Sequence, residues 1–228
     1  MLVLREVRTP YEDSFVSWSV PPRLMDQLWS GAWWFLGTTF FRQNMIAWRG
    51  KPAELLHLRI ALSRFQLSPS QRRIVRRNRD LQVILRQPVV DDERRQLFDR
   101  HKRRFAEGVP EALDDFLGPA PGVHPVPGIE FDLRFNGRLL ASSYVARGEN
   151  SLASLYGFFD PEMADRSLGI YTMLLEIAHA RRLGLRYYYP GYALSDASCM
   201  DYKKRFWGLE SYEWDTGWRP FPRQIGGV

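Results

Sequence analysis

Four residues near the C-terminal end of the sequence have side chains suited to proton transfer and to binding negative charge. Tyr192 follows an aromatic run, and Tyr202, Lys203 and Arg205 come shortly after it. A phenol can donate a hydrogen bond or relay a proton, and cations beside it can stabilise an oxyanion. We therefore expect these four residues to be catalytic. The alternative is structural, because tyrosines also cap sheets and exposed cations are common.

Further polar residues lie in and around a turn that precedes the best-defined helix. The turn runs from Asp165 to Gly169, and unpaired N–H groups at a helix N-terminus favour an anion or a developing oxyanion. In the alternative interpretation, Ser167 caps the helix and Gly169 permits close packing. The substrate-binding candidates of this region are Tyr156, Asp160, Arg166, Ser167, Gly169 and Tyr171.

Other common catalytic arrangements are missing from the sequence. No Ser-His-Asp or Cys-His pattern stands out, and neither C-x-x-C nor H-E-x-x-H spacing occurs. We therefore predict no metal and no cofactor. The four histidines are scattered, and we interpret them as surface or structural residues: His57, His101, His124 and His179.

An amphipathic helix must position several of the candidates. Apolar side chains recur at i, i+3, i+4 and i+7, which predicts a helix over Ser167–Leu183 with one buried face. Gly184 follows as a stop signal, after cations that suit the negative end of the helix dipole. The residues that we expect on the buried face are Ile170, Met173, Leu174, Ile177, Ala178 and Leu183.

Strands flank this helix on both sides. We expect a strand at 151–159, then a buried strand at 187–189 closed by Pro190 and Gly191, and a basic aromatic helix near 200–206. This order favours an α/β sheet whose strand ends present a ligand crevice. Upstream, the sequence predicts helices near 23–36, 92–107 and 111–117, and strands near 40–48, 55–62, 81–86, 131–135 and 138–145, the last two joined by a tight Asn-Gly turn.

A strongly basic segment lies between residues 64 and 104. It holds thirteen Lys or Arg residues against five acidic residues. Ser68-Pro69-Ser70 predicts a helix start, and the arginines that follow cover one arc of about 160°, at 100° per residue. A basic stripe over an apolar back suits a helix that lies against RNA phosphates, although most charge runs are simply solvated. The RNA-binding candidates are Arg72, Arg73, Arg76 and Arg77.

Composition limits the class of protein. The chain has 228 residues, of which 45% are hydrophobic, and a formal net charge of +6. This length suits one or two domains, and we divide the chain into an α+β region at 1–86 and an α/β domain at 87–228. The single cysteine, Cys199, excludes a disulfide framework, and no signal peptide or long apolar run is present. We expect a cytoplasmic protein without a membrane partner.

Several motifs, taken in order, resemble the arginyl-tRNA–protein and bacterial leucyl-tRNA–protein transferases. They are YGFFDP at 156–161, RSLGIY at 166–171, ARRLGLRYYYPGY at 180–192, MDYKKRF at 200–206 and, upstream, SPSQRRIVRRNRDL at 68–81. The resemblance covers most of residues 20 to 215. It implies an N-acetyltransferase-like (GNAT) mixed sheet in the C-terminal half, preceded by a smaller α+β region.

The resemblance also implies a reaction. Members of the family transfer an amino acid from aminoacyl-tRNA to the α-amino group of a protein with an acidic N-terminal residue, which marks that protein for degradation. Because aminoacyl-tRNA is an activated ester, no strong nucleophile is required. Tyr202, Lys203 and Arg205 would hold the 3′ end of tRNA or the oxyanion. Asp160 would orient the attacking amine or recognise a basic aminoacyl side chain.

The chain departs from the family in its cysteines. The family's N-terminal half usually carries a cysteine set that binds an iron–sulfur cluster or another metal, and one thiolate cannot supply those ligands. Three alternatives stay open: a small-amine acceptor with the same donor, an acyl-CoA N-acyltransferase, and an inert RNA-binding homologue. The turn at 165–169 has a single glycine followed by bulky residues, which argues against CoA. Both arginine and leucine remain possible as the transferred amino acid.

Overall fold

The computed structural model describes residues 10–105, 111–118 and 120–222. The strands are β1 (Glu12–Val16), β2 (Trp34–Leu36), β3 (Thr39–Gln43), β4 (Met45–Trp48), β5 (Lys51–Ala61), β6 (Gln82–Arg86), β7 (Gly128–Phe135), β8 (Arg138–Arg147), β9 (Ser151–Phe159), β10 (Tyr187–Leu194), β11 (Leu209–Glu213) and β12 (Gly217–Pro220). The helices are α1 (Pro22–Ser30), α2 (Pro69–Arg77), α3 (Asp92–Lys102), α4 (Leu113–Leu117) and α5 (Leu168–Arg182), with 3₁₀ segments η1 (Leu62–Arg64), η2 (Pro161–Arg166) and η3 (Asp201–Arg205).

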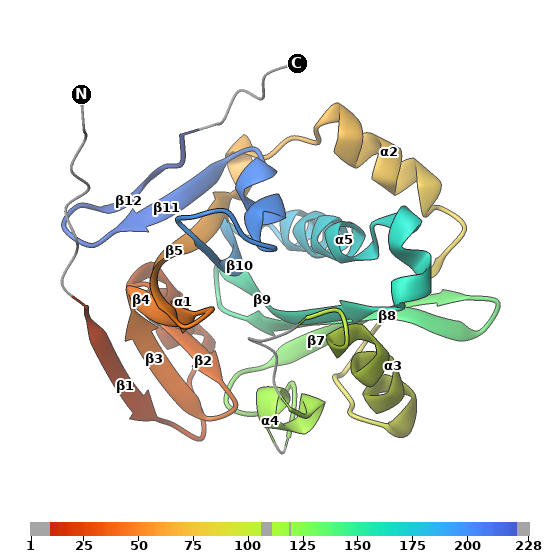
Figure 1. Ribbon diagram of the computed structural model, residues 1–228, viewed down its shortest axis with the longest axis horizontal. Helices are drawn as coiled ribbons and strands as arrows, with labels where there is room; N and C mark the ends of the chain where they lie inside the picture. The colour runs from red at the N-terminus through yellow and green to blue at the C-terminus, as the bar shows by residue number, and fades with distance from the viewer. Residues whose placement is uncertain (1–9, 106–110, 119, 223–228) are drawn as a thin grey trace.

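Two sheets organise these described residues (Figure 1). The smaller has three strands in the order β1-β3-β2, and the larger has nine, in the order β12-β11-β5-β10-β9-β8-β7-β6 with β4 paired to β5. The strands pair antiparallel, except that β9 and β10 run parallel. The expectation of an α/β protein with a large mixed sheet is therefore confirmed.

Helices cover both faces of the large sheet. α5 packs on β8, β9 and β10, and α2 lies beside α5 on the same side (Figure 1). α3 packs on β8 and β9 from the opposite side. Alternate residues of β7 divide accordingly: Phe131 and Leu133 join the core under α5, whereas Glu130 and Asp132 meet α3. In the described ranges, no helix has the length and apolarity needed to cross a membrane.

The two parallel strands part at their carboxyl ends. Among the described residues, their pairing extends from Ser151 opposite Tyr187 to Ala153 opposite Tyr189. Beyond this point β9 continues beside β8, and β10 continues beside β5. This is the position at which open α/β sheets present a ligand crevice.

β10 is longer than the sequence indicates. Pro190 and Gly191 do not close the strand, which continues to Leu194 through an irregular register at these two residues. Gly191 has a φ of +85°, a conformation that glycine adopts without strain. The irregularity turns β10 away from β9 while its pairing with β5 resumes.

The predicted helix over 167–183 is confirmed as α5, but its buried face is rotated from the expected one. Ala178 and Leu183 are exposed. Thr172, Glu176 and Ala180, which follow one another at i, i+4 and i+8, are buried instead. The apolar period missed this row because two of its three members are polar.

Two local signals in the sequence are confirmed. Ser68 caps α2 in a capping box, in which its hydroxyl accepts from the Gln71 N–H at 3.2 Å and its own N–H donates to Gln71 Oε1 at 2.9 Å. Asn136 and Gly137 both have positive φ, at 50° and 82°, as the two-residue turn between β7 and β8 requires.

Two predicted elements near the N-terminus need correction. The helix expected at 23–36 ends at Ser30, because the chain reverses at Ala32, whose φ is 64°, and enters β2. The strand expected at 40–48 is divided at Asn44 into β3 and β4. The buried Asn44 side chain accepts from the Tyr11 N–H at 2.8 Å, which fixes the break between the two strands.

Two helices are shorter than expected. The helix at 92–107 ends at Lys102, and residues 106 and 107 lie outside the described part. The basic aromatic helix at 200–206 is the 3₁₀ segment η3. Its first residue, Asp201, accepts from the Ser198 N–H at 3.1 Å, a local bond that suits a single turn.

The large sheet joins the two regions into which we divided the chain. β5 and β6 precede residue 87, yet β5 lies between β10 and β11, and β6 pairs with β7. The division of the chain into regions at 1–86 and 87–228 stays a prediction.

A buried ion-pair network joins α3 to β7. Arg94 is fully buried, donates to Asp132 Oδ2 at 2.6 Å and also pairs with Glu130. Asp91, just before the helix, accepts from Arg94 Nη1 at 2.7 Å. Burial, the largest influence, raises the pKa of Glu130 to about 7.

Candidate active site

A buried carboxylate lies under the point where β9 and β10 part. Glu176 projects from α5 and has no solvent exposure. The Tyr188 hydroxyl on β10 donates to Glu176 Oε2 at 2.6 Å. Burial raises the pKa of Glu176 to about 7, against the opposing influence of this hydrogen bond. A carboxyl group that titrates near neutrality can both accept and return a proton.

The second oxygen of this carboxylate lacks a donor. Among the described residues, Glu176 Oε1 and the Ser143 hydroxyl on β8 are buried without a hydrogen bond of normal geometry. Ser143 and Ser154 nevertheless lie close enough to lower the pKa of Glu176. This buried cluster therefore holds unused hydrogen-bonding capacity.

Lys203 on η3 brings a cation to the same place. Its Nζ donates to the Tyr192 carbonyl at 3.0 Å and lies 5.9 Å from the centre of the Tyr192 ring. Burial lowers the pKa of Lys203 to about 8, although the nearby Glu176 acts to raise it. A β-carbon added at Gly191 would lie 3.4 Å from this Nζ, so the glycine leaves room for the ammonium.

Two phenols complete the cluster. Burial raises the pKa of Tyr202 to about 12, with smaller influences from Cys199, Glu176 and Tyr156. Burial also raises the pKa of Tyr192. Both phenols are therefore protonated at neutral pH and act as hydrogen-bond donors.

Three of the four predicted catalytic residues thus lie together. Tyr192, Tyr202 and Lys203 surround the carboxyl ends of the parted strands, whereas Arg205 is exposed at the end of η3. Tyr156 stands near Tyr202 from the β9 side. Glu176 was missed. The signal available in the sequence was the helical spacing of i, i+4 and i+8 that places Thr172, Glu176 and Ala180 on one side of the helix.

The substrate-binding candidates of the turn before α5 are engaged within the fold. Arg166 forms a bidentate pair with Asp80, at 2.9 Å for each bond. Ser167 begins α5 in the left-handed conformation without a side-chain cap. A β-carbon at Gly169 would approach the Phe159 ring to 3.1 Å, so close packing explains the glycine.

The two remaining candidates of that set are buried. Asp160 is fully buried, pairs with Arg138 and with Arg100 at 3.9 Å, and caps η2 through the Glu162 N–H. Tyr171 is 5% exposed on α5. Their contacts fix the end of β9 and the start of α5.

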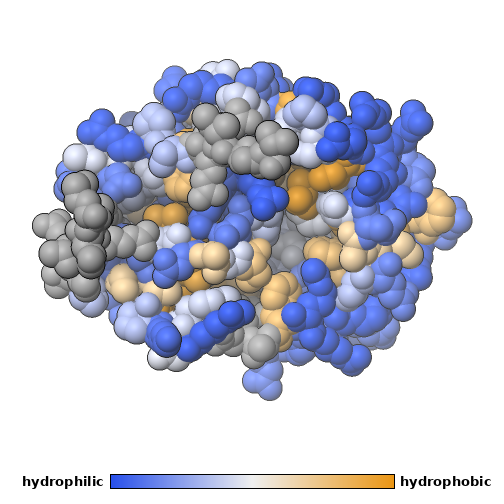
Figure 2. Space-filling view, turned by 45° about the horizontal axis from the view of Figure 1, so that its top comes forward, coloured by the Kyte–Doolittle hydropathy of each residue, from blue (hydrophilic) through white to orange (hydrophobic). Residues whose placement is uncertain are grey.

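The basic helix α2 presents exposed arginines. Arg72 donates to the Leu67 carbonyl at 2.7 Å, and Arg77 donates to the Asp165 carbonyl. Arg73 and Arg76 are exposed on the same helix. Figure 2 shows hydrophilic residues gathered over this part of the molecule. The Arg77 contact fastens α2 to the turn before α5, so the basic surface and the candidate site belong to one framework.

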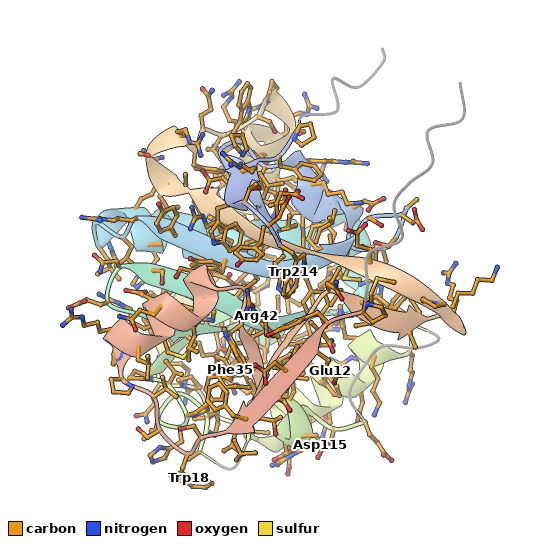
Figure 3. All side chains as sticks on the ribbon, turned by 90° about the vertical axis from the view of Figure 1, so that its left-hand side faces the viewer. Glu12, Trp18, Phe35, Arg42, Asp115 and Trp214 are labelled. Atoms are coloured by element: carbon orange, nitrogen blue, oxygen red, sulfur yellow. The ribbon has the colours of Figure 1, made fainter. Side chains whose placement is uncertain are left out.

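Aromatic contacts connect the site to the small sheet. The Arg42 guanidinium on β3 lies 4.9 Å from the Trp214 ring and donates to the Tyr212 hydroxyl at 3.0 Å (Figure 3). His57 lies between Trp214 and Tyr192, with ring centres 6.0 and 6.5 Å away. Burial lowers the pKa of His57 to about 4, so its ring is neutral.

The described residues offer no metal centre. No group of three His, Cys, Asp or Glu side chains among them could hold an ion. His101 is buried like His57 and has its Nδ1 3.1 Å from the Phe159 carbonyl. Burial lowers its pKa to about 4, which supports a structural role.

Comparisons with a family model and with individual proteins point to the same family. Residues 93–213 match the family model "Arginine-tRNA-protein transferase, C terminus". The aspartate/glutamate leucyltransferase of Pseudomonas paraeruginosa is 36% identical over 158 residues, which is 68% of this chain and 66% of that protein. The enzyme of the same name from Stenotrophomonas maltophilia is 34% identical over 182 residues, 75% of this chain and 70% of that protein.

The likeness to solved structures is more distant. L-PGS from Bacillus licheniformis superposes with a TM-score of 0.41 and 16% identity, covering 64% of this chain and 48% of that one. The chain spans just under two thirds, 66%, of the Pseudomonas relative that it matches.

Proposed function

Because the chain belongs to the arginine-tRNA–protein transferase C-terminal family, we propose that it is an aminoacyltransferase using aminoacyl-tRNA as donor and a protein N-terminal α-amino group as acceptor. The names of its relatives favour leucine as the transferred residue and an N-terminal Asp or Glu as acceptor. The protein would then take part in marking substrates for degradation.

The observation that carries this proposal is the cluster at the parted ends of β9 and β10. Lys203 and the phenols of Tyr192 and Tyr202 supply donors for the oxyanion that forms when an amine attacks the ester carbonyl. The ester is already activated, so the protein needs to orient the amine, move its proton and stabilise charge. Arg205, exposed beside this cluster, would contact the tRNA 3′ end.

The α2 arginines support the tRNA donor. Arg72, Arg73, Arg76 and Arg77 are all exposed, and the Arg77 contact with the turn before α5 ties this basic surface to the helix that carries Glu176. A phosphate-binding surface fixed to the site would direct the esterified 3′ end toward it.

We also propose that the C-terminal half has the N-acetyltransferase-like fold. The antiparallel β7, β8 and β9, the parallel step from β9 through α5 to β10, and the parting of those strands support this assignment. The turn before α5 is occupied by Arg166, Ser167 and the Gly169–Phe159 packing, which disfavours a CoA pyrophosphate there.

The test is a transfer assay with the purified chain. Bulk tRNA charged with individual labelled amino acids is incubated with peptides that begin with Asp, Glu or Ala. We expect label from leucyl-tRNA to enter the Asp and Glu peptides and to leave the Ala peptide unlabelled.

Other outcomes identify the alternatives. Transfer to a small amine and to no peptide contradicts the protein acceptor. Label from arginyl-tRNA alone contradicts leucine as donor. Intact esters in every single-turnover reaction indicate an inert RNA-binding protein, and micromolar acetyl-CoA binding by calorimetry indicates an acyl-CoA enzyme.

A further inference from the structure

Two buried polar atoms at the site make no hydrogen bond of normal geometry with the described residues. They are Glu176 Oε1 on α5 and Ser143 Oγ on β8, which approach each other across the helix–sheet interface. Leaving a buried polar group unpaired costs roughly 1–3 kcal/mol, more for a charged one. Such pairs of unused atoms are rare in native interiors and call for a ligand or a functional reason.

The sheet carries no side chain over this spot. Gly157 on β9 is exposed and lies opposite Ser143 in the β8–β9 ladder. A β-carbon there would point between the Ser143 β-carbon, at 3.4 Å, and Thr172 Oγ1, at 3.8 Å. Thr172 lies one turn before Glu176 on α5, so both project from the same side of the helix. Gly157 thus leaves this part of β9, beside Ser143 and Thr172, without a side chain.

The chemistry of the two atoms selects a donor-rich, cationic ligand. A carboxylate oxygen and a hydroxyl accept hydrogen bonds. An amine brings two or three N–H donors and, when protonated, a positive charge opposite to that of the carboxylate. Lys203 holds its own ammonium at the Tyr192 carbonyl on the other side of the cluster and leaves Oε1 unfilled.

We propose that Glu176 and Ser143 bind the acceptor's α-amino group, which enters past Gly157, and that Glu176 takes its proton. This inference rests on the proposed aminoacyl transfer and names the base for it. The amine nitrogen forms the C–N bond to the ester carbonyl, and the C–O bond to the ribose breaks with its electron pair on the ribose oxygen. Starting from the bound ammonium, the nitrogen loses two protons on becoming the amide: Glu176 takes one and returns it to the ribose oxygen, and the other is released to solvent.

Proton affinities suit an N-terminal amine better than a lysine. Burial raises the pKa of Glu176 to about 7, and a free α-amine has a pKa near 8, so transfer between them is almost balanced. A lysine amine, with a pKa of about 10.4, would be deprotonated at least a hundredfold less readily. The groups that face Glu176 are Tyr188 from β10, Ser143 from β8, Ser154 from β9, and Tyr202 and Lys203 from η3.

The test uses the full chain, leucyl-tRNA and a peptide beginning with Asp, in single-turnover assays across pH. For Glu176→Gln we expect a rate lower by about 10²–10⁴-fold and loss of the rate inflection near pH 7, with tRNA affinity unchanged. For Gly157→Ala, whose added carbon fits without a clash, we expect a higher peptide KM, since the route is narrowed. Ser143→Ala should raise the same KM.

A matched control is Glu130→Gln. Glu130 is equally buried and has a similarly raised pKa of about 7, but it lies on the α3 side of the sheet. Its transfer rate per folded molecule should stay within about twofold of the parent, because the substitution lies away from the chemistry. Circular dichroism gives the folded fraction for this correction.

Failure of this inference differs from failure of the proposed function. If the parent transfers no amino acid, the function itself is wrong. If the parent transfers and Glu176→Gln keeps its rate and pH profile, Glu176 is a structural residue and the inference is overturned. Should Glu176→Gln fail to fold, the peptide KM of Gly157→Ala and Ser143→Ala decides: unchanged values overturn the inference, and raised values support it.

Discussion

Lys203 carries a charge that its surroundings oppose. Burial lowers its pKa from 10.5 to about 8, so below pH 8 the folded protein must keep an ammonium in a place that favours the neutral amine. Between about pH 8 and 10.5 the unfolded chain binds a proton that the folded one does not. Stability attributable to this residue therefore rises with pH across that window. The penalty is the cost of holding this ammonium in a buried place beside the Tyr192 carbonyl.

Replacing Lys203 by Met should expose this penalty. We expect Lys203→Met to raise the free energy of unfolding relative to the parent, and this gain to be larger at pH 7 than at pH 10 by about 1–2 kcal/mol. One pKa unit corresponds to about 1.4 kcal/mol, and the side chain is only half-buried. Urea denaturation at both pH values measures it. Lys204→Met, which removes a neighbouring ion pair with Asp201, is the control and should show a smaller difference. A pH-independent effect at Lys203 would mean that its ammonium is well solvated.

For single residues, the sequence indicated which side-chain types could take part in chemistry but not which of them are buried. Tyr192, Tyr202 and Lys203 were predicted because their side chains suit proton transfer or charge stabilisation and lie after the expected strand, in motifs shared with the family. Glu176 escaped because a glutamate inside a helix is ordinarily placed on the solvent side, and only the packed structure shows that its row faces the sheet. Asp160 was chosen for its carboxylate, but Arg138 and Arg100 engage that group.

Among the elements, α2 makes the tRNA proposal measurable. Arg73 and Arg76 are the arginines to change, because Arg77 also anchors the helix to the Asp165 carbonyl. In Arg73→Gln/Arg76→Gln we expect weaker tRNA binding for all sequences alike and a log–log salt slope that is shallower by about 1 for each lost phosphate contact. Filter binding at several salt concentrations measures both.

The matched control for α2 lies at the end of α5. Arg181 and Arg182 are, like Arg73 and Arg76, two exposed arginines on one helix, in the last turn of α5. Their double change to Gln removes the same charge and should alter the slope less. Equal effects of the two double variants would indicate attraction by net charge and contradict a specific α2 surface.

Arg94 is the buried part of the α3–β7 connection, which also includes the Glu93–Arg134 ion pair at 2.6 Å. Arg94→Met leaves the buried Glu130 without its cation, and breaking a buried pair in this way costs about 3–5 kcal/mol. The adjacent Arg95→Met removes an exposed pair with Asp114, which solvent screens, and should cost much less than Arg94→Met. Urea denaturation of the two variants compares them directly. A loss below about 1 kcal/mol for Arg94→Met would show that water replaces the guanidinium.

Elements with local signals were predicted well. The capping box of α2, the Asn-Gly turn and the apolar period of α5 are written in neighbouring residues, so each was found from the sequence. β10 was cut short because Pro190 and Gly191 usually end a strand, and its continuation depends on β5, which is distant in sequence.

For the molecule as a whole, the sequence predicted the mixed α/β class but not the strand order. β5 was expected to belong to an N-terminal region, whereas it pairs with β10 on one edge and with β11 on the other. Pairings of this range depend on the matching of complete strands, which no local pattern reports. The parting of β9 and β10, beside which the candidate site lies, is a property of the assembled sheet.

The central place of β5 has a consequence for how the protein is made. β5 leaves the ribosome early, but its partners β10 and β11 follow up to roughly 150 residues later, a delay of about 7–30 s at typical rates of synthesis. Throughout that interval the part of β5 beyond Glu54, which β4 does not pair, lacks its partners on both edges and is available for pairing with other chains, a known route to aggregation. Recovery of active protein should therefore depend on chaperone supply and translation speed more than its equilibrium stability suggests. Slowing expression by lower temperature is the corresponding practical measure.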